Sequence, residues 1–373
     1  MTATLANTPL HDWHVAQGGR MVDFAGWSMP VQYTSIVAEH RATRTAAGLF
    51  DISHMGRLRF DGPSAAPFLD RLATRRASKL AIGQVVYALV TNESGGILDD
   101  ILIYRLADAA QRDYFLVVVN ASNREKIVSW IRSRPAADDL QFADLTTDWA
   151  MIAVQGPHAL QLVAPLVEFD LAAMKYYTAT ETLIAGHGGI VSRTGYTGED
   201  GVELIVGAAM APRIWQMLFD RSQSEQLGAV AAGLGSRDTL RLEAGMPLYG
   251  HELSENVNPF QAGLGFAVDL ANAQFPGAAE LARFKADSSQ PRRVGLELVG
   301  KRVPREGYAI LDPAGATIGQ VTSGTFSPTF DRPLAMGYVA PQFAAPGAQL
   351  AIDIRGRAEP ARIAALPFYR RSR

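Results

Sequence analysis

Two adjacent carboxylates, Asp99 and Asp100, stand inside an otherwise apolar run that follows the pair Gly95-Gly96. A run rich in Ile and Leu predicts a strand, here over residues 97–104, and the glycine pair predicts the turn before it. Because a strand alternates its side chains, the two carboxylates are expected on opposite faces. Those faces are otherwise apolar, with Ile97, Ile101 and Ile103 on one and Leu98, Leu102 and Tyr104 on the other.

At least one of these carboxylates is therefore expected in a poorly solvated place. Burying a carboxylate without a partner costs free energy, so a buried one commonly has a chemical role. The alternative is structural: one Asp caps the turn by accepting from backbone amides, and the other faces water.

The bulk composition is that of a globular protein with ample core. A length of 373 residues predicts about two or three domains. The net charge of -2 gives no overall drive toward nucleic acid. The lack of cysteine excludes disulfides, thiol nucleophiles and cysteine-ligated metals. The histidines have no metal-binding spacing and the glycine-rich runs match no nucleotide fingerprint, so we expect neither a metal nor a nucleotide.

The first residues carry no basic segment and no long apolar stretch, which argues against a signal or transit peptide. No run approaches the roughly 20 apolar residues of a membrane span. We therefore expect a cytoplasmic protein that does not contact a membrane.

The elements that position the two carboxylates follow a recognisable order. A strand and a helix come first, then paired strands, a third strand, a helix opened by a capping box at 122–125, and a closing strand. The strands are expected at 56–61, 85–90, 97–104, 114–119 and 140–144. The helices are expected at 63–72 and from the capping box to about 132. This is the ferredoxin-like order with one extra strand.

The flanking segments predict a second unit of similar order and a separate C-terminal domain. Residues 15–34 predict an ordered loop, and 35–47 a helix capped by Thr34 or Ser35 and ended by Gly48. Further elements are expected at 150–155 (strand), from 156 (helix), at 183–192 (strand), at 212–222 (helix) and at 237–246 (helix capped by Ser236). A linker helix over 271–290 precedes short strands, which predict a small barrel or sandwich.

Motifs along nearly the whole chain resemble those of one family, the aminomethyltransferases, which are the T-proteins of the glycine cleavage system. They are MVDFAGWSMP (21–30), FDISHMG (50–56), GGILDD (95–100), SRTGYTGEDGVEL (192–204), GLGSRDTLRLE (233–243) and TSGTFSPT (322–329). The resemblance implies an α+β fold of three domains around a folate channel. These are a discontinuous folate-binding domain (1–53 and 145–275), a ferredoxin-like domain with the catalytic Asp (54–144) and a C-terminal β-barrel or jelly-roll-like domain (290–373).

The resemblance also implies the reaction. The methylene carbon of an aminomethyl group on a lipoylated H-protein passes to tetrahydrofolate, the co-substrate, and ammonia, methylenetetrahydrofolate and the dihydrolipoyl H-protein leave. One alternative is a folate-dependent demethylase of a small methylated substrate. Another is a non-enzymatic folate-binding protein, whose signature carries a cysteine that this chain lacks.

The resemblance selects Asp100 over Asp99 as the catalytic residue, which holds and polarises the folate amine. For Asp99 we favour a role as a turn or supporting acceptor. Folate contacts are expected from the aromatic rings of Tyr87, Tyr104 and Tyr196. Glu203 is expected to accept two parallel N–H bonds, and Arg237 to supply a cation. Asn120 and Met55 are expected beside them.

Two charge assignments leave structural alternatives open. Arg237, in the first turn of its helix, either faces the ligand or pairs with Asp238 or Asp200. The C-terminal region is locally basic and is either a solvated face or a docking surface for an acidic carrier. Its basic residues are Arg292, Arg293, Lys301, Arg302, Arg305, Arg357, Arg362, Arg370, Arg371 and Arg373.

Overall fold

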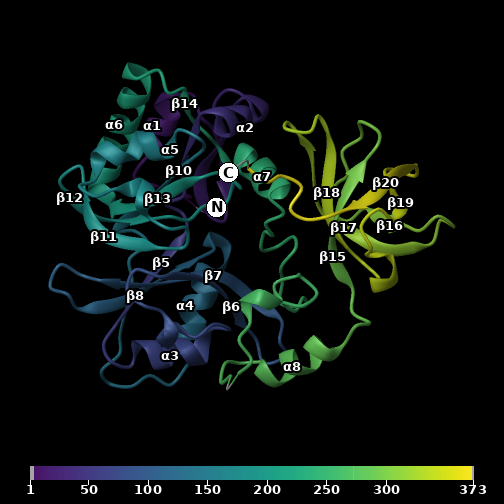
Figure 1. The fold of residues 1–373 in the computed structure, drawn as a ribbon, viewed down its shortest axis with the longest axis horizontal. Coiled ribbons are helices and arrows are strands. Elements are labelled where there is room, and N and C mark those ends of the chain that lie inside the picture. Colours follow the sequence, from purple (N-terminus) through teal and green to yellow (C-terminus); the bar gives the residue numbers. More distant parts are fainter. Residues whose placement is uncertain (1–3, 272, 372–373) are drawn as a thin grey trace.

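The computed structural model describes residues 4–271 and 273–371. Two large sheets with their helices, the upper and the lower sheet in the view of Figure 1, form one side of the molecule, and a closed barrel forms the other. The N-terminal strands form a small third sheet. Helix α7 (Leu234–Glu243) lies between the upper sheet and the barrel. In the described part of the chain, no helix is long and apolar enough to cross a membrane. The domain boundaries given above remain a prediction.

The lower sheet has the predicted ferredoxin-like order with an extra edge strand. Its strand order is β6 (Val85–Thr91), β7 (Ile97–Ala107), β8 (Asp113–Val119), β5 (Gly56–Asp61), β9 (Gln141–Asp144). All neighbouring pairs are antiparallel. Helices α3 (Ala65–Leu72) and α4 (Arg124–Arg132) bury their apolar faces with one face of this sheet in a common core.

The strict alternation expected for the carboxylate strand is wrong at its first residues. The register between β6 and β7 shifts, so that Val90 pairs with Asp99 while Thr91 pairs with Ile97. Leu98 is the extra residue of this β-bulge, and it packs with Ile101 in the core under the helices. Ile97 packs in a different cluster, so Ile97 and Leu98 have exchanged the faces that the sequence pattern assigned.

The upper sheet has six strands, β11 (Ala179–Ile184), β12 (His187–Ser192), β13 (Gly201–Gly207), β10 (Trp149–Gln155), β4 (Ala47–Asp51) and β14 (Ala229–Ala231), in this order. Helices α5 (Ala159–Val163) and α6 (Ala211–Ser224) pack on it. Two expectations need correction here. Residues 183–192 form a hairpin, not one strand, with the turn at Ala185 and Gly186. Gly48 does not end a helix but lies buried within β4.

The N-terminal loop expected over 15–34 is a further misassignment. It contains the hairpin β2 (Arg20–Phe24) and β3 (Trp27–Gln32), after β1 (Ala6–Asn7) and α1 (His11–Ala16). Helix α2 (Ile36–Thr45) follows, and Ser35 caps it as predicted by accepting from the Ala38 amide at 3.1 Å.

Two predicted helix caps are not formed. Helix α7 begins one turn early, after Gly233, and Ser236 lies inside the helix, where its hydroxyl donates to the Gly233 carbonyl at 2.9 Å. The residue before α4 is Asn123, and its side chain donates to Asp99 instead of capping the helix. At α4 a tertiary contact with Asp99 takes up the side chain before the helix, whereas at α7 the helix starts before the predicted cap.

Helix α8 (Ala278–Ala286) confirms the linker helix and leads to a closed barrel. The strands follow each other around the barrel as β15 (Arg292–Leu298), β18 (Arg332–Val339), β17 (Thr317–Ser327), β16 (Ala309–Leu311), β19 (Gln349–Asp353) and β20 (Ala358–Ala364). The sequence left a choice between a barrel and a sandwich, and the barrel is found.

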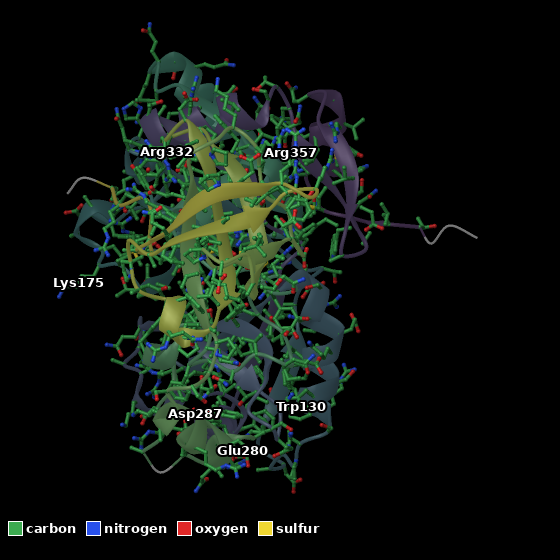
Figure 2. All side chains as sticks on the ribbon, turned by 90° about the vertical axis from the view of Figure 1, so that its right-hand side faces the viewer. Trp130, Lys175, Glu280, Asp287, Arg332 and Arg357 are labelled. Carbon is green, nitrogen blue, oxygen red and sulfur yellow. The ribbon has the colours of Figure 1, made fainter. Side chains whose placement is uncertain are left out.

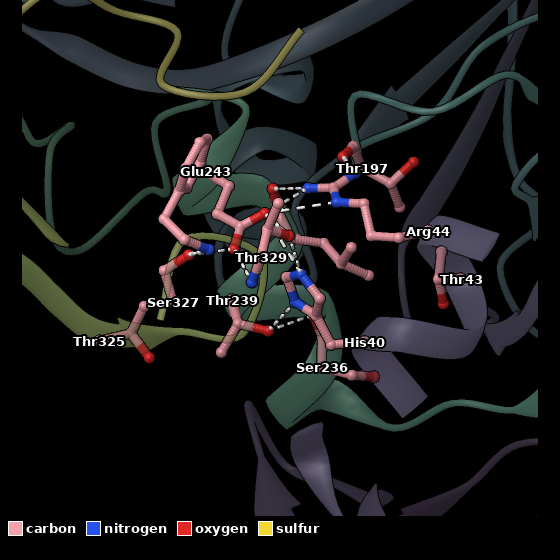
Figure 3. A network of polar contacts seen from close by, with 12 residues as sticks. His40, Thr43, Arg44, Thr197, Ser236, Thr239, Glu243, Thr325, Ser327 and Thr329 are labelled. Carbon is pink, nitrogen blue, oxygen red and sulfur yellow. Dashed lines mark hydrogen bonds and ion pairs between the residues drawn. The ribbon is translucent and has the colours of Figure 1, made fainter. Parts of the chain in front are cut away.

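A buried polar network joins the barrel to the upper sheet through Glu243, the last residue of α7 (Figure 3). Its carboxylate accepts a hydrogen bond at 2.5 Å from Ser327, the last residue of β17, and one at 2.7 Å from Thr329, just after that strand. From α2, Arg44 donates to it at 2.9 Å and His40 lies 3.2 Å away. One side chain thus fixes α2, α7 and the barrel to each other.

Candidate active site

A cavity of about 930 Å³ opens between the two sheets, α7 and the barrel. Its wall includes residues of the lower sheet, the upper sheet and the barrel, such as Asp100, Glu203 and Ser323. This volume is in the range of about 300–1,000 Å³ that small-molecule sites occupy. The elements described above therefore enclose space for one extended ligand.

Asp100 projects into this cavity from β7. Oδ2 accepts from the Tyr87 hydroxyl at 3.0 Å, and Oδ1 accepts from Nδ2 of Asn120 at 2.7 Å. Burial raises the pKa of the Asp100 carboxyl, although these two hydrogen bonds oppose the effect. The arrangement holds a carboxyl in a fixed orientation and raises its pKa, and both properties suit acid–base chemistry.

Asp99 lies behind Asp100 and is 0% exposed. It accepts from the backbone amide of Asn120 at 3.0 Å, from Nδ2 of Asn120 at 2.8 Å and from Nδ2 of Asn123 at 2.6 Å. Burial, and then the charge of Asp100, raise its pKa. Asp99 is the supporting acceptor that the sequence favoured.

Glu203 faces the same cavity from β13 and is 5% exposed. Its Oε2 accepts from the Thr194 hydroxyl at 2.5 Å. Burial raises the pKa of Glu203, while the Thr194 bond and the charge of Arg237 lower it. Among the described residues only Oε2 is engaged, so Oε1 is available as an acceptor for a ligand.

Arg237 lines the cavity from α7, and its guanidinium lies over the Tyr196 ring, 4.8 Å from the centroid. Its Nη1 is buried without a hydrogen-bond partner among the described residues. The alternative partners are engaged elsewhere, since Asp238 pairs with Arg241 at 2.8 Å and Asp200 with Arg193 at 2.5 Å. Arg237 is half-buried, and a buried N–H group without a hydrogen bond costs free energy, which points to a ligand group that completes it.

Tyr196 owes its position to the glycine-rich loop before it. A side chain at Gly195 would collide with Gln155, so the backbone approach requires glycine. The Tyr196 hydroxyl donates to the Pro247 carbonyl at 2.5 Å, which leaves its ring for contact with a ligand.

The structure brings nearly all predicted site residues to one cavity: Asp100, Tyr87, Asn120, Met55, Tyr196, Glu203 and Arg237 line it. Tyr104 is the exception. It is 0% exposed and packs in the core between the two sheets, outside the cavity lining. Tyr104 shares the Asp100 face of β7 but lies four residues further on, about 13 Å along the strand. The prediction that Tyr104 contacts the ligand is therefore wrong.

Sequence reasoning missed several basic side chains of the cavity wall, among them His54 and Arg293. His54 is 3% exposed, and burial with the charges of Arg237 and Arg57 lowers its pKa to about 3, so its ring is neutral. Arg293 of β15 reaches back to the Ala262 and Gly245 carbonyls at 2.8 and 3.0 Å. The FDISHMG motif marked the neighbourhood of His54, whereas Arg293 meets its partners only in the tertiary structure.

The basic residues of the barrel are only partly free. Arg302 pairs with Glu359 at 2.7 Å and Arg362 with Glu297 at 2.5 Å, while Arg357 is exposed. Arg332 and Arg357 lie toward the same end of the barrel in the view of Figure 2. Arg373 lies outside the described residues. A carrier docking surface on the barrel stays a prediction.

Comparisons with known proteins agree with this geometry. Two family models match, the GCVT N-terminal domain over residues 10–272 and the glycine cleavage T-protein C-terminal barrel domain over 292–370. An aminomethyltransferase of Saccharopolyspora erythraea is 47% identical and covers 98% of both chains, and one of Rubrobacter xylanophilus is 48% identical over 99% of this chain and 96% of its own. The crystal structure of the glycine cleavage system aminomethyltransferase T from Bartonella henselae matches with a TM-score of 0.89 and 34% identity, over 98% of each chain. The chain therefore belongs to the glycine cleavage T-protein family, the aminomethyltransferases.

Proposed function

We propose that this chain transfers the methylene carbon of an aminomethyl group, carried on the lipoyl arm of an H-protein, to tetrahydrofolate. The observation that carries the proposal is the meeting of Asp100, Glu203 and Arg237 in one cavity. A single ligand can then engage a carboxylate and a cation at one end while its reacting amine lies near a second carboxylate.

The residues of the cavity suit a reduced folate as substrate. Glu203 accepts the two parallel N–H bonds of an aminopyrimidine edge, a geometry that carboxylates favour. Arg237 supplies donors from its unpartnered Nη1 to carbonyl or carboxylate oxygens. The rings of Tyr196 and Tyr87 flank the flat parts of the ligand.

Asp100 acts on the reacting amine. In the overall reaction the carbon–sulfur bond to the arm breaks, two carbon–nitrogen bonds to folate form, and ammonia leaves. The two hydrogens lost from the folate amines end on the thiol of the arm and on ammonia. Asp100 accepts a proton from the attacking amine and returns it to a leaving group, and Tyr87 and Asn120 keep the carboxyl aimed at that amine.

The alternatives are less well supported. Both relatives named above are aminomethyltransferases, which favours aminomethyl transfer over demethylation of a small molecule. A folate-binding protein without activity would not need a carboxyl with a raised pKa at the cavity, such as Asp100.

The deciding assay measures ammonia released from aminomethylated H-protein with and without tetrahydrofolate. We expect release that depends on folate, together with formation of methylenetetrahydrofolate. A protein that instead consumes a small N-methylated amine, and leaves the loaded carrier intact, would be the demethylase.

A further inference from the structure

Asp99 does not line the cavity, yet it is tied to the carboxyl that does. Nδ2 of Asn120 lies 2.8 Å from Oδ1 of Asp99 and 2.7 Å from Oδ1 of Asp100. One amide group therefore uses its two hydrogens to bridge two neighbouring carboxyls. The β-bulge at Leu98 sets this register, because Asp99 pairs with Val90 and Asp100 with Leu89.

Asp99 is fully buried, Asp100 is half-buried at the cavity, and neither carboxyl has a cation beside it. Neither forms an ion pair with a lysine or arginine among the residues that the structure describes. All three groups that contact Asp99 are N–H donors, from Asn120 and Asn123. Two adjacent carboxyls that are desolvated in this way do not both ionise, so they titrate as one coupled unit.

The other charged or titratable groups near the pair do not supply the missing charge. Lys126 of α4 is engaged by the Tyr249 hydroxyl at 2.8 Å and by Glu255 at 3.0 Å. Arg293 of β15 is held by backbone carbonyls. The phenols that face the pair, Tyr87, Tyr196 and Tyr249, have pKa values raised first of all by burial, so they remain neutral donors.

We propose that Asp99 is a positioning residue for Asp100: through the side chain of Asn120 the two carboxyls form one couple that retains a single proton at neutral pH. The couple can then take or give a proton at the cavity near neutral pH, and Asn120 keeps the orientation of Asp100 as its charge changes. The link to catalysis rests on the proposed function, whereas the shared proton does not.

Two variants should shift the pH at which the couple loses its proton, in opposite directions. Asp99→Asn removes the neighbouring negative charge, so the remaining carboxyl should lose its proton at lower pH, by about one pH unit or more. Asn123→Leu removes one N–H donor from the Asp99 anion, so the couple should hold its proton to higher pH. Asp144→Asn is the control, since Asp144 is a carboxylate of the same domain whose contacts are Thr146 and Arg124.

The first readout is an infrared titration of the carbonyl band of protonated carboxyls, which needs no turnover. We expect the midpoint to fall in Asp99→Asn, to rise in Asn123→Leu and to stay in Asp144→Asn. The second readout is the acidic limb of the pH profile of ammonia release, which should move with the midpoint while folate affinity is unchanged.

Midpoints that stay at the wild-type value, or that move in the same direction in both variants, would overturn the couple. Opposite shifts without folate-dependent ammonia release from the wild type would keep the couple and refute the proposed function. If Asp99→Asn does not fold, the rise in Asn123→Leu decides alone, and its absence refutes the inference.

Discussion

Tyr87 donates its hydroxyl hydrogen to Asp100 from the neighbouring strand, with 3.0 Å between the two oxygens. On its other side the Tyr87 ring stacks on Phe266, at 6.0 Å between centroids, and Phe266 is 66% exposed. Tyr87 therefore connects the Asp100 carboxyl to the rim of the cavity. Because burial and the charge of Asp100 raise the pKa of Tyr87, the phenol acts only as a donor in this contact.

Replacing Asp100 by Asn should abolish most of the transfer while the protein still folds. The amide keeps the shape of the side chain but cannot accept and return a proton. A loss of about 10²–10⁴-fold in turnover, or roughly 3–5 kcal/mol, is expected. Ammonia release from aminomethylated H-protein measures it. The control is Asp113→Asn, an exposed carboxylate of β8 that should keep full activity. Near-normal turnover in Asp100→Asn would remove Asp100 from the chemistry.

Glu203→Gln should weaken tetrahydrofolate binding more than it slows the reaction at saturating folate. The variant loses a charged acceptor, and Thr194 then faces a neutral amide. The expected cost in binding is about 1.5–3 kcal/mol. Calorimetric titration with tetrahydrofolate measures the affinity. If the affinity is unchanged, Glu203 does not contact the folate.

Arg237→Met should lower folate affinity but should not destabilise the free protein. Arg237 is a half-buried cation without an ion pair among the described residues, so a neutral side chain of similar length should be neutral or stabilising, by about 1 kcal/mol. Thermal unfolding with and without tetrahydrofolate separates the two effects.

Arg241→Met provides the matched control for Arg237. Arg241 pairs with Glu252 at 2.7 Å, and removing one partner of a buried pair costs about 3–5 kcal/mol. A large loss of stability in the free Arg237→Met protein, equal to that of Arg241→Met, would show that Arg237 has a structural partner after all.

The free energy of unfolding should depend on pH through Glu243. Burial alone would raise its pKa, but hydrogen bonds from His40 and Ser327 and the charge of Arg44 lower it from 4.5 to about 2. The unfolded chain thus binds this proton first as the pH falls. The ionised Glu243 therefore adds up to about 3 kcal/mol to the free energy of unfolding. This contribution is complete above about pH 4.5 and is lost as the pH falls toward 2.

Denaturant unfolding between pH 7 and 3 tests this prediction. Glu243→Gln should be less stable at pH 7 and should show a flatter dependence on pH below 4.5. Glu125→Gln, at an 83% exposed side chain, should follow the wild type. The same slope in Glu243→Gln as in the wild type would place the acid-sensitive group elsewhere.

Sequence patterns predicted the elements whose local signals agree with their packing. Strand β5 spans Gly56–Asp61, as its alternation predicts, and Ser35 caps α2. Prediction failed where a tertiary contact overrides the local signal. The turn of the N-terminal hairpin places Ala25 at a φ of 52°, a conformation that no local residue preference announces. The sequence does not indicate the bulge at Leu98 either, because both faces of β7 accept an apolar side chain.

The residues of the cavity could be predicted from the sequence for a different reason. Motif resemblance selected Asp100, Glu203 and Arg237, whereas periodicity alone could not separate Asp100 from Asp99. Tyr104 was misplaced because alternation gives the face of a strand but not what covers that face further along. Arg293 was missed as a wall residue because it comes from the barrel, and only the docking of the barrel brings it to the cavity.

The Glu243 network also bears on how the protein is made. Its partners Ser327 and Thr329 are among the later residues of the chain, and the backbone amide of Tyr369 donates to the Glu243 carbonyl at 2.8 Å. Since a ribosome delivers the chain from its N-terminus, α7 emerges long before these partners. A nascent or C-terminally shortened chain holds Glu243 and Arg44 without them and leaves the barrel side of the cavity open. We therefore expect the wall of the cavity to be complete only when synthesis of the chain is nearly finished.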